Sequence, residues 1–285
     1  MPNTRTALID GDFLLYKIGF GSQKTQYRVF VRGEEEDGHL RVFRLKKDLM
    51  AYMNGMGEGL EDWSWDKYIV HDSWGITKYN IEVTLNTILK NCGANKNPII
   101  FFTDEENFRN EVAKILPYKG NRDSSHKPHW FKEIKEYILA NYDCRVPYKL
   151  EADDSLGIYQ MKAESGTTII YTPDKDLNMI PGYRLTKDDE VIYIDDDSAR
   201  RSFYGQLIQG DSTDNIPGIY KVANKKFTKK VKEGLAGCDF PEVYDYILEL
   251  YDGDKDAIEE IGALLYMKRT YEDKVNVTDF DWRYS

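Results

Sequence analysis

Three apolar runs in this 285-residue chain are each followed by an aspartate. In chain order they are residues 7–9 before Asp10, residues 99–103 before Asp104, and residues 168–171 shortly before Asp174. Unbroken apolar runs of this length are typical of strands covered on both faces, which favours a parallel sheet. The ligand crevice of such a sheet lies at the carboxyl ends of its strands. Several carboxylates would therefore meet in one crevice, where they repel one another unless a cation neutralises them. The pattern predicts a divalent-metal site and, with it, phosphate chemistry.

The composition limits the class of protein. A chain of this length suits one large domain, or a domain with a lobe, and can bury a substantial core. The hydrophobic content of 41% and charged content of 31% are those of an ordinary soluble protein. A net charge of −10 argues against a generic basic nucleic-acid coat. It does not exclude a nuclease, because metal-binding acids add to the negative count.

The cysteines and the hydropathy indicate the compartment. Cys92, Cys144 and Cys238 are far apart and form no C-x-x-C pair, which favours a reducing compartment and no zinc site. No apolar stretch approaches the ~18 residues that span a bilayer, and the N-terminus lacks a signal-peptide apolar region. We expect a cytoplasmic protein with no membrane role.

The order of patterns along the chain predicts an α/β fold with a central, mainly parallel, doubly wound sheet flanked by helices. One expected helix starts near Phe13, and three more cover residues 77–91, about 130–141, and 151–163. The expected strands include residues 99–103, 168–172 and 191–194. Alternating apolar residues at 27–45 around a glycine-rich turn predict a β-hairpin. We expect an α/β domain at 1–198, with an insertion at 21–75, and a helical region at 199–285.

Acidic clusters follow the strand-end aspartates. Each has an ordinary structural explanation: Glu151-Ala152-Asp153-Asp154 can be an acidic helix N-terminus, Asp174-Lys175-Asp176 a solvated loop, and residues 210–218 a turn before a helix cap. Their order along the chain is what makes a chance origin improbable. Two Mg²⁺ ions, which take oxygen ligands and keep several waters, would suit nine such acids. The nine are Asp10, Asp104, Glu151, Asp153, Asp154, Asp174, Asp176, Asp211 and Asp214.

Two basic segments are candidates for holding nucleic acid. Lys119 and Arg122 can grip a phosphate beside a metal cluster, and Tyr118 can stack on a base, although an ordinary surface turn would look the same. A second segment carries lysines at helical spacing, which would form a basic ridge that contacts the DNA backbone or simply faces solvent. Its candidate DNA-binding residues are Lys221, Lys225, Lys226 and Lys229.

These motifs together resemble the flap endonuclease/5′-nuclease superfamily. The resemblance rests on Ile9–Asp12, Tyr118–Arg122, Glu151–Asp154, Thr172–Asp176 and Gly210–Gly218, in that order, and covers roughly residues 6–235. It is strongest to bacteriophage 5′-to-3′ exonucleases of the podovirus gene-six type. It implies a PIN-like catalytic domain, a helix-hairpin-helix-like C-terminal part, and a monomer in the cytoplasm of the host cell.

The resemblance also implies roles for the residues. One Mg²⁺ or Mn²⁺ ion would be held by the acids from Asp10 to Asp154, and a second through Asp174, Asp176, Asp211 and Asp214. Lys119 and Arg122 would contact the scissile phosphate, and Tyr118 the terminal base. The substrate would be double-stranded DNA with a free or flapped 5′ end, with RNA in hybrids as a second substrate.

The sequence departs from the family pattern at two places. The interval between Arg122 and Glu151 is short, whereas many family members carry a long helical arch there. The segment 218–223 lacks the second glycine of the family's cation-binding hairpin, and Lys221 is a candidate to replace the cation. The resulting prediction is a 5′-to-3′ exonuclease. The alternatives are a structure-specific flap endonuclease, a relative that binds DNA without cutting it, and a purely structural cation site.

Overall fold

The computed structural model describes residues 5–33, 38–56, 60–94, 97–122, 126–238 and 240–272. Its internal contacts divide the chain into two compact units. The first comprises Met1–Leu14, Asn86–His126 and Leu139–Ser285, and the second Leu15–Leu85 and Lys127–Ile138. Among the described residues, no helix combines the length and the apolar character needed to cross a membrane.

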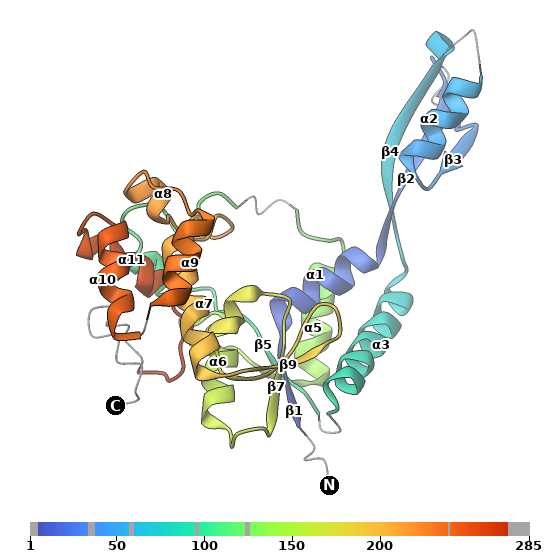
Figure 1. Cartoon of the computed structure of the whole chain (residues 1–285). Coiled ribbons are helices and arrows are strands. Elements are labelled where there is room, and N and C mark those ends of the chain that lie inside the picture. The colour runs from blue at the N-terminus through green and yellow to red at the C-terminus, as the bar shows by residue number, and fades with distance from the viewer. Residues whose placement is uncertain are drawn as a thin grey trace. The chain divides into compact units, whose positions relative to one another are not determined.

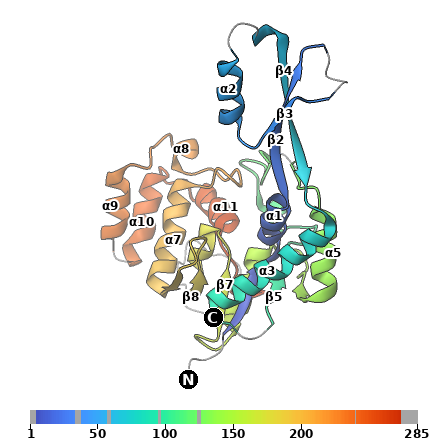
Figure 2. The same ribbon diagram turned by 90° about the vertical axis from the view of Figure 1, so that its right-hand side faces the viewer.

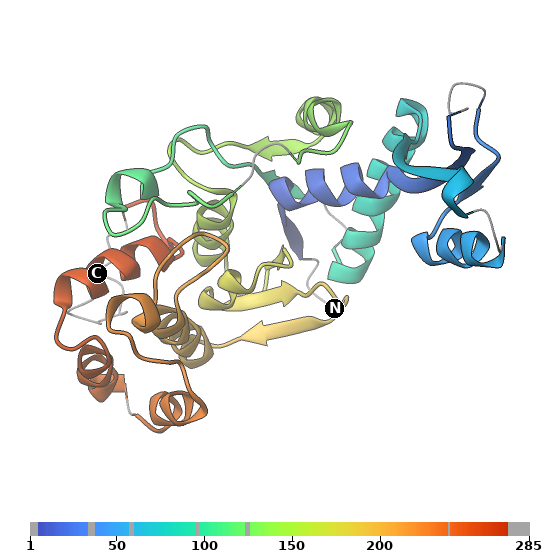
Figure 3. The same cartoon turned by 90° about the horizontal axis from the view of Figure 1, so that it is seen from above.

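A six-stranded sheet forms the centre of the first unit, in the order β6-β5-β1-β7-β8-β9. The strands are β1 (Thr6–Asp10), β5 (Ile99–Phe101), β6 (Asp143–Arg145), β7 (Thr168–Tyr171), β8 (Gly182–Leu185) and β9 (Val191–Ile194). All neighbours are parallel except β9, which runs antiparallel to β8, as the two opposed arrows in yellow show in Figure 3. The strand order reverses direction at β1, which places the carboxyl end of β1 at the switch point where ligands bind in such sheets.

The register aligns the ends of the three central strands. Asp10, the last residue of β1, pairs with Phe101 at the end of β5, and Ile9 pairs with Tyr171 at the end of β7. Helix α1 (Gly11–Gly21) starts directly after β1. A side chain on Gly11 would collide with the carbonyl oxygen of Phe101 and the ring of Phe102, so the turn from strand to helix requires glycine. Aspartates that follow these strands therefore converge on one edge.

Helix α6 (Ala152–Lys162) packs against β1, β5 and β7. It starts right after Glu151, so the E-x-D-D segment is both the start of a helix and a neighbour of the sheet edge. The short elements α4 (Arg109–Val112) and η3 (Lys175–Met179) follow β5 and β7, and α5 (Phe131–Asn141) precedes β6.

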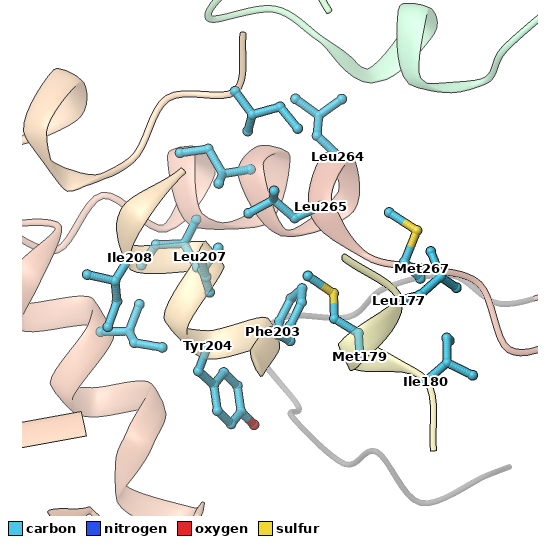
Figure 4. Packing of buried hydrophobic residues seen from close by; sticks show 14 of the residues in the cluster. Leu177, Met179, Ile180, Phe203, Tyr204, Leu207, Ile208, Leu264, Leu265 and Met267 are labelled. Atoms are coloured by element: carbon cyan, nitrogen blue, oxygen red, sulfur yellow. The ribbon is translucent and has the colours of Figure 1, made fainter. Parts of the chain in front are cut away.

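The helices after the sheet belong to the same compact unit as the sheet. They are α7 (Asp196–Gln209), α8 (Ile219–Val222), α9 (Lys229–Gly237), α10 (Phe240–Leu250) and α11 (Lys255–Leu265). Helices α9, α10 and α11 lie beside α7 in Figure 2 and contact it. Figure 4 shows the core they share with η3, in which Phe203 and Leu207 of α7 face Leu265 of α11 and Met179. The expected boundary at residue 198 falls inside α7 and does not separate compact units.

The second unit contains a three-stranded antiparallel sheet, in the order β3-β2-β4. Its strands are β2 (Gln23–Val31), β3 (Arg41–Phe43) and β4 (Trp63–His71), with η2 (Leu60–Asp62) just before β4. Tyr27 pairs with Phe43, which confirms the predicted hairpin. Helix α2 (Lys46–Gly55) packs on β2 and β3 (Figure 1), and α3 (Trp74–Cys92) follows β4.

The predicted fold class is confirmed, and one local prediction is wrong. Lys225 and Lys229 do not share a helix, because α8 ends at Val222 and α9 begins at Lys229. The predicted lysine ridge at helical spacing therefore does not form. Residues 223–228 instead form an irregular connection, in which Asn224 has a φ of 53°. Thr228 caps α9 by accepting a hydrogen bond from the Val231 amide.

Candidate metal centre and its surroundings

The buried carboxylate of Asp10 stands at the centre of the sheet edge. Its Oδ1 accepts a hydrogen bond from the Phe13 amide (3.0 Å), and its Oδ2 accepts one from the Thr172 hydroxyl (3.0 Å). Burial, with help from the nearby charges of Asp12 and Asp174, raises the pKa of Asp10 to about 7. A carboxyl in this environment resists ionisation and is stabilised as an anion when a cation lies beside it.

Asp153, in the first turn of α6, shares this negative environment. Burial, followed by the charges of Asp10 and Asp174, raises the pKa of Asp153 well above its usual range. Its Oδ1 is buried and has no hydrogen-bond partner among the described residues. Buried carboxylate oxygens are normally satisfied, so an orphaned one beside two further acids indicates a missing positive partner.

A second group of acids follows β7. Asp174 caps η3 by accepting a hydrogen bond from the Asp176 amide (2.9 Å), and Asp176 itself is buried. Burial and the charges of Asp174 and Asp211 raise the pKa of Asp176 to about 7, although the Gln206 amide donates a hydrogen bond to it. Asp174 thus connects Asp10 and Asp153 electrostatically to Asp176 and Asp211.

The loop that carries Asp211 and Asp214 is held in a tight turn. Asp211 and Ile216 form an antiparallel bridge, and Asp211 Oδ1 accepts a hydrogen bond from the Thr213 amide (2.6 Å). Gly210 has a φ of 73°, and a side chain there would collide with the backbone of Gly218. The G-D-x-x-D-N-I-P-G segment therefore needs both glycines so that its two ends can lie against each other.

The basic loop at 117–122 docks on this acidic loop. The Lys119 amide donates to the Asp214 carbonyl (2.8 Å), and the Asn121 side chain donates to the Ser212 carbonyl (2.7 Å). The Lys119 ammonium pairs with Glu151 and lies 3.6 Å from Asp214 Oδ2, and Arg122 pairs with Asp214. Both predicted phosphate-binding side chains therefore lie at the rim of the acidic cluster, and each forms an ion pair with one of its carboxylates.

Tyr118 corrects one prediction. Its side chain is buried, and its hydroxyl lies 2.8 Å from Glu151 Oε2 and 2.8 Å from Asp214 Oδ2. A hydroxyl has one proton, so it can donate to only one of these carboxylates at a time. Burial and the charge of Glu151 raise the pKa of Tyr118, which keeps the phenol protonated. Because the ring is packed in the core, Tyr118 cannot stack on a nucleobase as expected.

Asp154 is also placed differently from the other acids. It is fully buried, and both of its oxygens accept hydrogen bonds from Arg109, at 2.6 and 3.0 Å. Its Oδ1 also accepts a hydrogen bond from the Lys268 amide (3.1 Å). The prediction that Asp154 ligates a metal does not agree with these contacts, because a bidentate arginine occupies the carboxylate.

Arg109 is the functional residue that the sequence did not indicate. The same guanidinium reaches Glu151 Oε2 (3.3 Å) and the carbonyls of Leu264 (2.8 Å) and Tyr266 (2.9 Å). Burial opposes the ionisation of Glu151, but the positive charges of Arg109 and Lys119 outweigh it and lower the pKa of Glu151. Arg109 is a single basic residue that follows an acidic segment in the sequence, and it belongs to no motif or regular spacing that could have identified it.

Asp104 completes the sheet edge after β5. Its Oδ2 accepts a hydrogen bond from the Lys149 amide (2.8 Å), and its Oδ1 accepts one from the Glu105 amide (2.9 Å). The preceding residue, Thr103, donates its amide to Asp12 Oδ2 and accepts a hydrogen bond from the Ala152 amide. Thr103 therefore ties the end of β5 to the first turns of α1 and α6.

Two of the four lysines that were predicted to bind DNA are paired with acidic side chains. The Lys225 ammonium is 2.6 Å from Asp252 Oδ1 and donates to the Glu249 carbonyl (2.8 Å). Lys229 lies 3.6 Å from Glu233, one turn further along α9. Lys221 and Lys226 are exposed. The role of these four lysines in DNA binding stays a prediction.

The residues fit a divalent cation chemically. The donors are carboxylate oxygens, which hard cations such as Mg²⁺ prefer. Three of them have raised pKa values, chiefly because burial disfavours the charged form and also because neighbouring carboxylates repel them. No three carboxylate, imidazole or thiol groups in the described part of the chain are close enough to form a complete ligand set by themselves. Ions that keep several waters would suit such a set, because water can bridge the remaining gaps.

Comparisons with known proteins agree with this fold. No protein-family profile matches the chain. It is 28% identical over 170 residues to a 5′-3′ exonuclease of Buchnera aphidicola subsp. Schizaphis graminum, which covers 52% of this chain and 56% of that protein. It is 29% identical over 150 residues to a 5′-3′ exonuclease of Buchnera aphidicola subsp. Baizongia pistaciae, which covers 45% and 46%. The chain thus spans about half the length of these curated relatives.

Solved structures share the fold. A T5 5′-exonuclease with bound zinc superposes over 92% of this chain and 89% of its own, with a TM-score of 0.52 and 15% identity. The T5 D15 protein co-crystallised with metal ions superposes over 66% and 80%, with a TM-score of 0.51 and 16% identity.

The protein has a PIN-like α/β fold, and the edge of its sheet gathers acidic residues, three of them with raised pKa values, beside a lysine and an arginine. The chain is therefore similar in sequence to two 5′-3′ exonucleases over about half of its length, and it shares the fold of the T5 5′-exonuclease. The narrower resemblance to the podovirus gene-six type stays a prediction.

Proposed function

We propose that this protein is a metal-dependent 5′-to-3′ exonuclease that hydrolyses phosphodiester bonds from the 5′ ends of double-stranded DNA. The proposal is supported most by the orphaned Oδ1 of Asp153, which lies in the negative field of Asp10 and Asp174. Buried carboxylates in such a group are tolerated only with a counter-cation. The Buchnera relatives are named 5′-3′ exonucleases, which supports the same direction of attack.

The cofactor in this proposal is a pair of Mg²⁺ or Mn²⁺ ions. Two groups of residues would hold them: Asp10, Asp104, Glu151 and Asp153 for one ion, and Asp174, Asp176, Asp211 and Asp214 for the other. When bound, such ions lower the pKa of a water nucleophile and neutralise charge on the phosphate. Asp154 is left out of the first group because Arg109 occupies both of its oxygens.

The chain's own residues would hold the substrate phosphate. In hydrolysis, a water oxygen bonds to phosphorus, the bond to the 3′ oxygen of the departing nucleotide breaks, and that oxygen takes up a proton. Lys119 and Arg122 now pair with Glu151 and Asp214. A phosphate at the rim would replace these carboxylates as their partner and place two positive charges where negative charge develops. Asn121 and the Lys119 amide keep the loop docked meanwhile.

Paired substitutions test the two ion sites. Asp10→Asn and Asp174→Asn each keep the size of the side chain but remove its charge. We expect each to lower turnover on 5′-labelled duplex DNA by more than about 100-fold, since even supporting residues around a metal typically cost 10- to 100-fold. DNA affinity measured in Ca²⁺ should change little. Near-normal turnover by Asp174→Asn would contradict the second ion site.

The alternative enzyme is a flap endonuclease with little exonuclease action. The described part of the interval between Arg122 and Glu151 holds the helix α5 and the strand β6, and residues 123–125 lie outside the described residues. This short interval favours the exonuclease. Side-by-side digestion of blunt duplex and 5′-flap substrates, with product lengths resolved, separates the two. A hybrid with a 5′ RNA segment in the same assay tests RNA as a second substrate.

Two alternatives without catalysis are tested by the same digests. A relative that only binds DNA would retain affinity in Ca²⁺ and release no product in Mg²⁺. A structural cation site would lower the melting temperature on chelation without any cleavage. Arg109 occupies both oxygens of Asp154. The hydrogen bonds and ion pairs described for the other eight predicted acids include no arginine bound in this way. Their oxygens could therefore reach a metal ion, which favours a working site.

The proposal also covers the DNA-binding surface and the oligomeric state. We propose that residues 199–285 contribute the duplex-binding surface, that Lys221 takes the place of the monovalent cation of the family's hairpin, and that the protein acts as a monomer. Strong, saturable dependence of DNA binding on potassium would count against the role of Lys221.

A further inference from the structure

Tyr148 has the most exposed side chain among the large apolar and aromatic residues of the described chain, with 74% of its surface accessible. It lies between the edge strand β6 and helix α6, on the same side of the sheet as the acidic edge, because the carboxyl ends of parallel strands meet there.

The turn that carries Tyr148 is fixed directly to the candidate metal centre. The Lys149 amide donates to Asp104 Oδ2 (2.8 Å), and the Asp104 amide donates to the Leu150 carbonyl (3.1 Å). The Leu150 amide closes the turn on the Pro147 carbonyl (3.3 Å). The position of Tyr148 therefore depends on a carboxylate that we expect to ligate metal.

The backbone of this turn is unfavourable for its sequence. Lys149 has a φ of 57°, in the left-handed region that residues other than glycine and asparagine seldom adopt. The conformation is maintained by the hydrogen bond to Asp104 and by two ion pairs of the lysine, with Glu106 (3.1 Å) and Glu111 (3.2 Å). Strain of this kind that the surroundings hold in place is a reason to look for function.

The chemistry around Tyr148 selects the part of the substrate it can contact. The Lys149 ammonium lies 5.7 Å from the ring centroid, but its charge is taken by Glu106 and Glu111. The turn thus offers no free cation for a phosphate. It offers an aromatic face in solvent, and every nucleobase can stack on such a face.

We infer that Tyr148 is a stacking platform for a nucleobase of the substrate strand beside the scissile phosphate. The inference rests on the proposed nuclease function and names a further substrate-binding residue for it. It gives the stacking role to a tyrosine that is accessible, whereas Tyr118 is buried. An ordinary exposed turn tyrosine would have no effect on substrate binding.

The test combines changes in the protein with changes in the DNA. Tyr148→Ala removes the ring, and Tyr148→Phe keeps it. The matched control is Tyr193→Ala, since Tyr193 is 59% exposed on β9, at the opposite edge of the sheet from β6. Melting temperatures check that all variants fold. The substrate is duplex DNA with 2-aminopurine, or an abasic nucleotide, at either side of the mapped cleavage position.

We expect Tyr148→Ala to raise KM about tenfold with little change in kcat, and Tyr148→Phe and Tyr193→Ala to behave like wild type. In Ca²⁺, 2-aminopurine should be quenched by wild type and by Tyr148→Phe but not by Tyr148→Ala. With the abasic nucleotide, wild type and Tyr148→Ala should become equal.

Two results would overturn the inference: a Tyr148→Ala enzyme equal to wild type on normal duplex, or a Tyr148→Phe enzyme as poor as Tyr148→Ala. Wild-type protein that cuts no DNA would instead contradict the proposed function. In that case, the fluorescence quenching is measured with 2-aminopurine at the two 5′-terminal nucleotides. If the wild-type protein does not quench it, stacking is contradicted as well.

Discussion

Arg109 is a fully buried cation whose five side-chain hydrogen bonds end on two carboxylates and two carbonyls. Burial alone would lower its pKa, but the charges of Asp154 and Glu151 raise it instead. The arginine therefore stays charged, holds Asp154 as a structural partner and orients Glu151 toward Lys119. The three acids of the segment from Glu151 to Asp154 therefore differ: Asp154 is bound by Arg109, Glu151 by Arg109 and Lys119, and one oxygen of Asp153 has no partner among the described residues.

This division predicts different results for neighbouring acids. Asp154→Ala leaves the Arg109 charge without its bidentate partner, and breaking a buried pair costs about 3–5 kcal/mol of unfolding free energy. Asp153→Ala removes a repelled charge, so it should leave stability unchanged or raise it while it abolishes cleavage. Urea unfolding of the metal-free proteins checks both. Equal destabilisation by the two substitutions would mean that Asp154 has no special structural role.

A compensating variant provides the control. Arg109→Met combined with Asp154→Leu removes both charges and keeps apolar volume in the buried site. Replacing a buried ion pair by apolar residues is often tolerated, so this double variant should be more stable than Asp154→Ala alone.

At the scale of elements, α6 is held between the sheet and the chain after α11. Gly157 lies in the middle of α6, and a Cβ there would come within 2.5 Å of the Lys268 carbonyl oxygen and 2.8 Å of Ile180. The Lys268 amide also binds Asp154. The close approach of this segment to α6 thus depends on a residue without a side chain.

Two glycine substitutions measure this packing. Gly157→Ala should destabilise the protein by about 1–3 kcal/mol, because the overpacked segment must move. Gly205→Ala, in α7, meets no atom within 4 Å among the described residues and should stabilise the protein by up to about 1 kcal/mol, through helix propensity. Thermal unfolding of both variants is the measurement. A neutral Gly157→Ala would show that residues 267–269 can shift freely.

The elements also show what a sequence can predict. Runs such as residues 7–9 and 168–171 are apolar enough to be recognised as buried strands, and both were predicted near their observed bounds. The strands β6 and β8 were missed because Asp143-Cys144-Arg145 and Gly182-Tyr183-Arg184-Leu185 carry charged side chains on short edge-side segments. The acids of the site could be found from their order, but Arg109 and the burial of Tyr118 depend on tertiary contacts that no spacing encodes.

At the scale of the whole molecule, the acidic edge links stability to pH and metal. Asp10 and Asp176 have pKa values of about 7, against 3.8 for an ordinary aspartate. A raised folded-state pKa means that protonation of these groups favours the folded state below about pH 4. That contribution is lost as the pH rises from about 4 to 7. Metal-free protein should therefore lose stability from these groups over this window.

Divalent metal should replace the lost protons. We expect Mg²⁺ to raise the melting temperature more at about pH 8 than at about pH 5.5, because protons compete with the ion at the lower pH. Calorimetry in Mg²⁺ and in EDTA at both pH values measures the difference. Asp176→Asn is the control and should flatten the pH dependence. An equal effect of Mg²⁺ at both pH values would argue against carboxylates of raised pKa as its ligands.

The hydrogen bonds from Arg109 to the carbonyls of Leu264 and Tyr266 join segments that are more than 150 residues apart in the chain. A chain that stops before residue 264 lacks both carbonyls, so Arg109 would keep only its hydrogen bonds to Glu151 and Asp154. Such a chain contains all nine predicted metal-binding acids but only part of the contacts that hold Arg109 beside them.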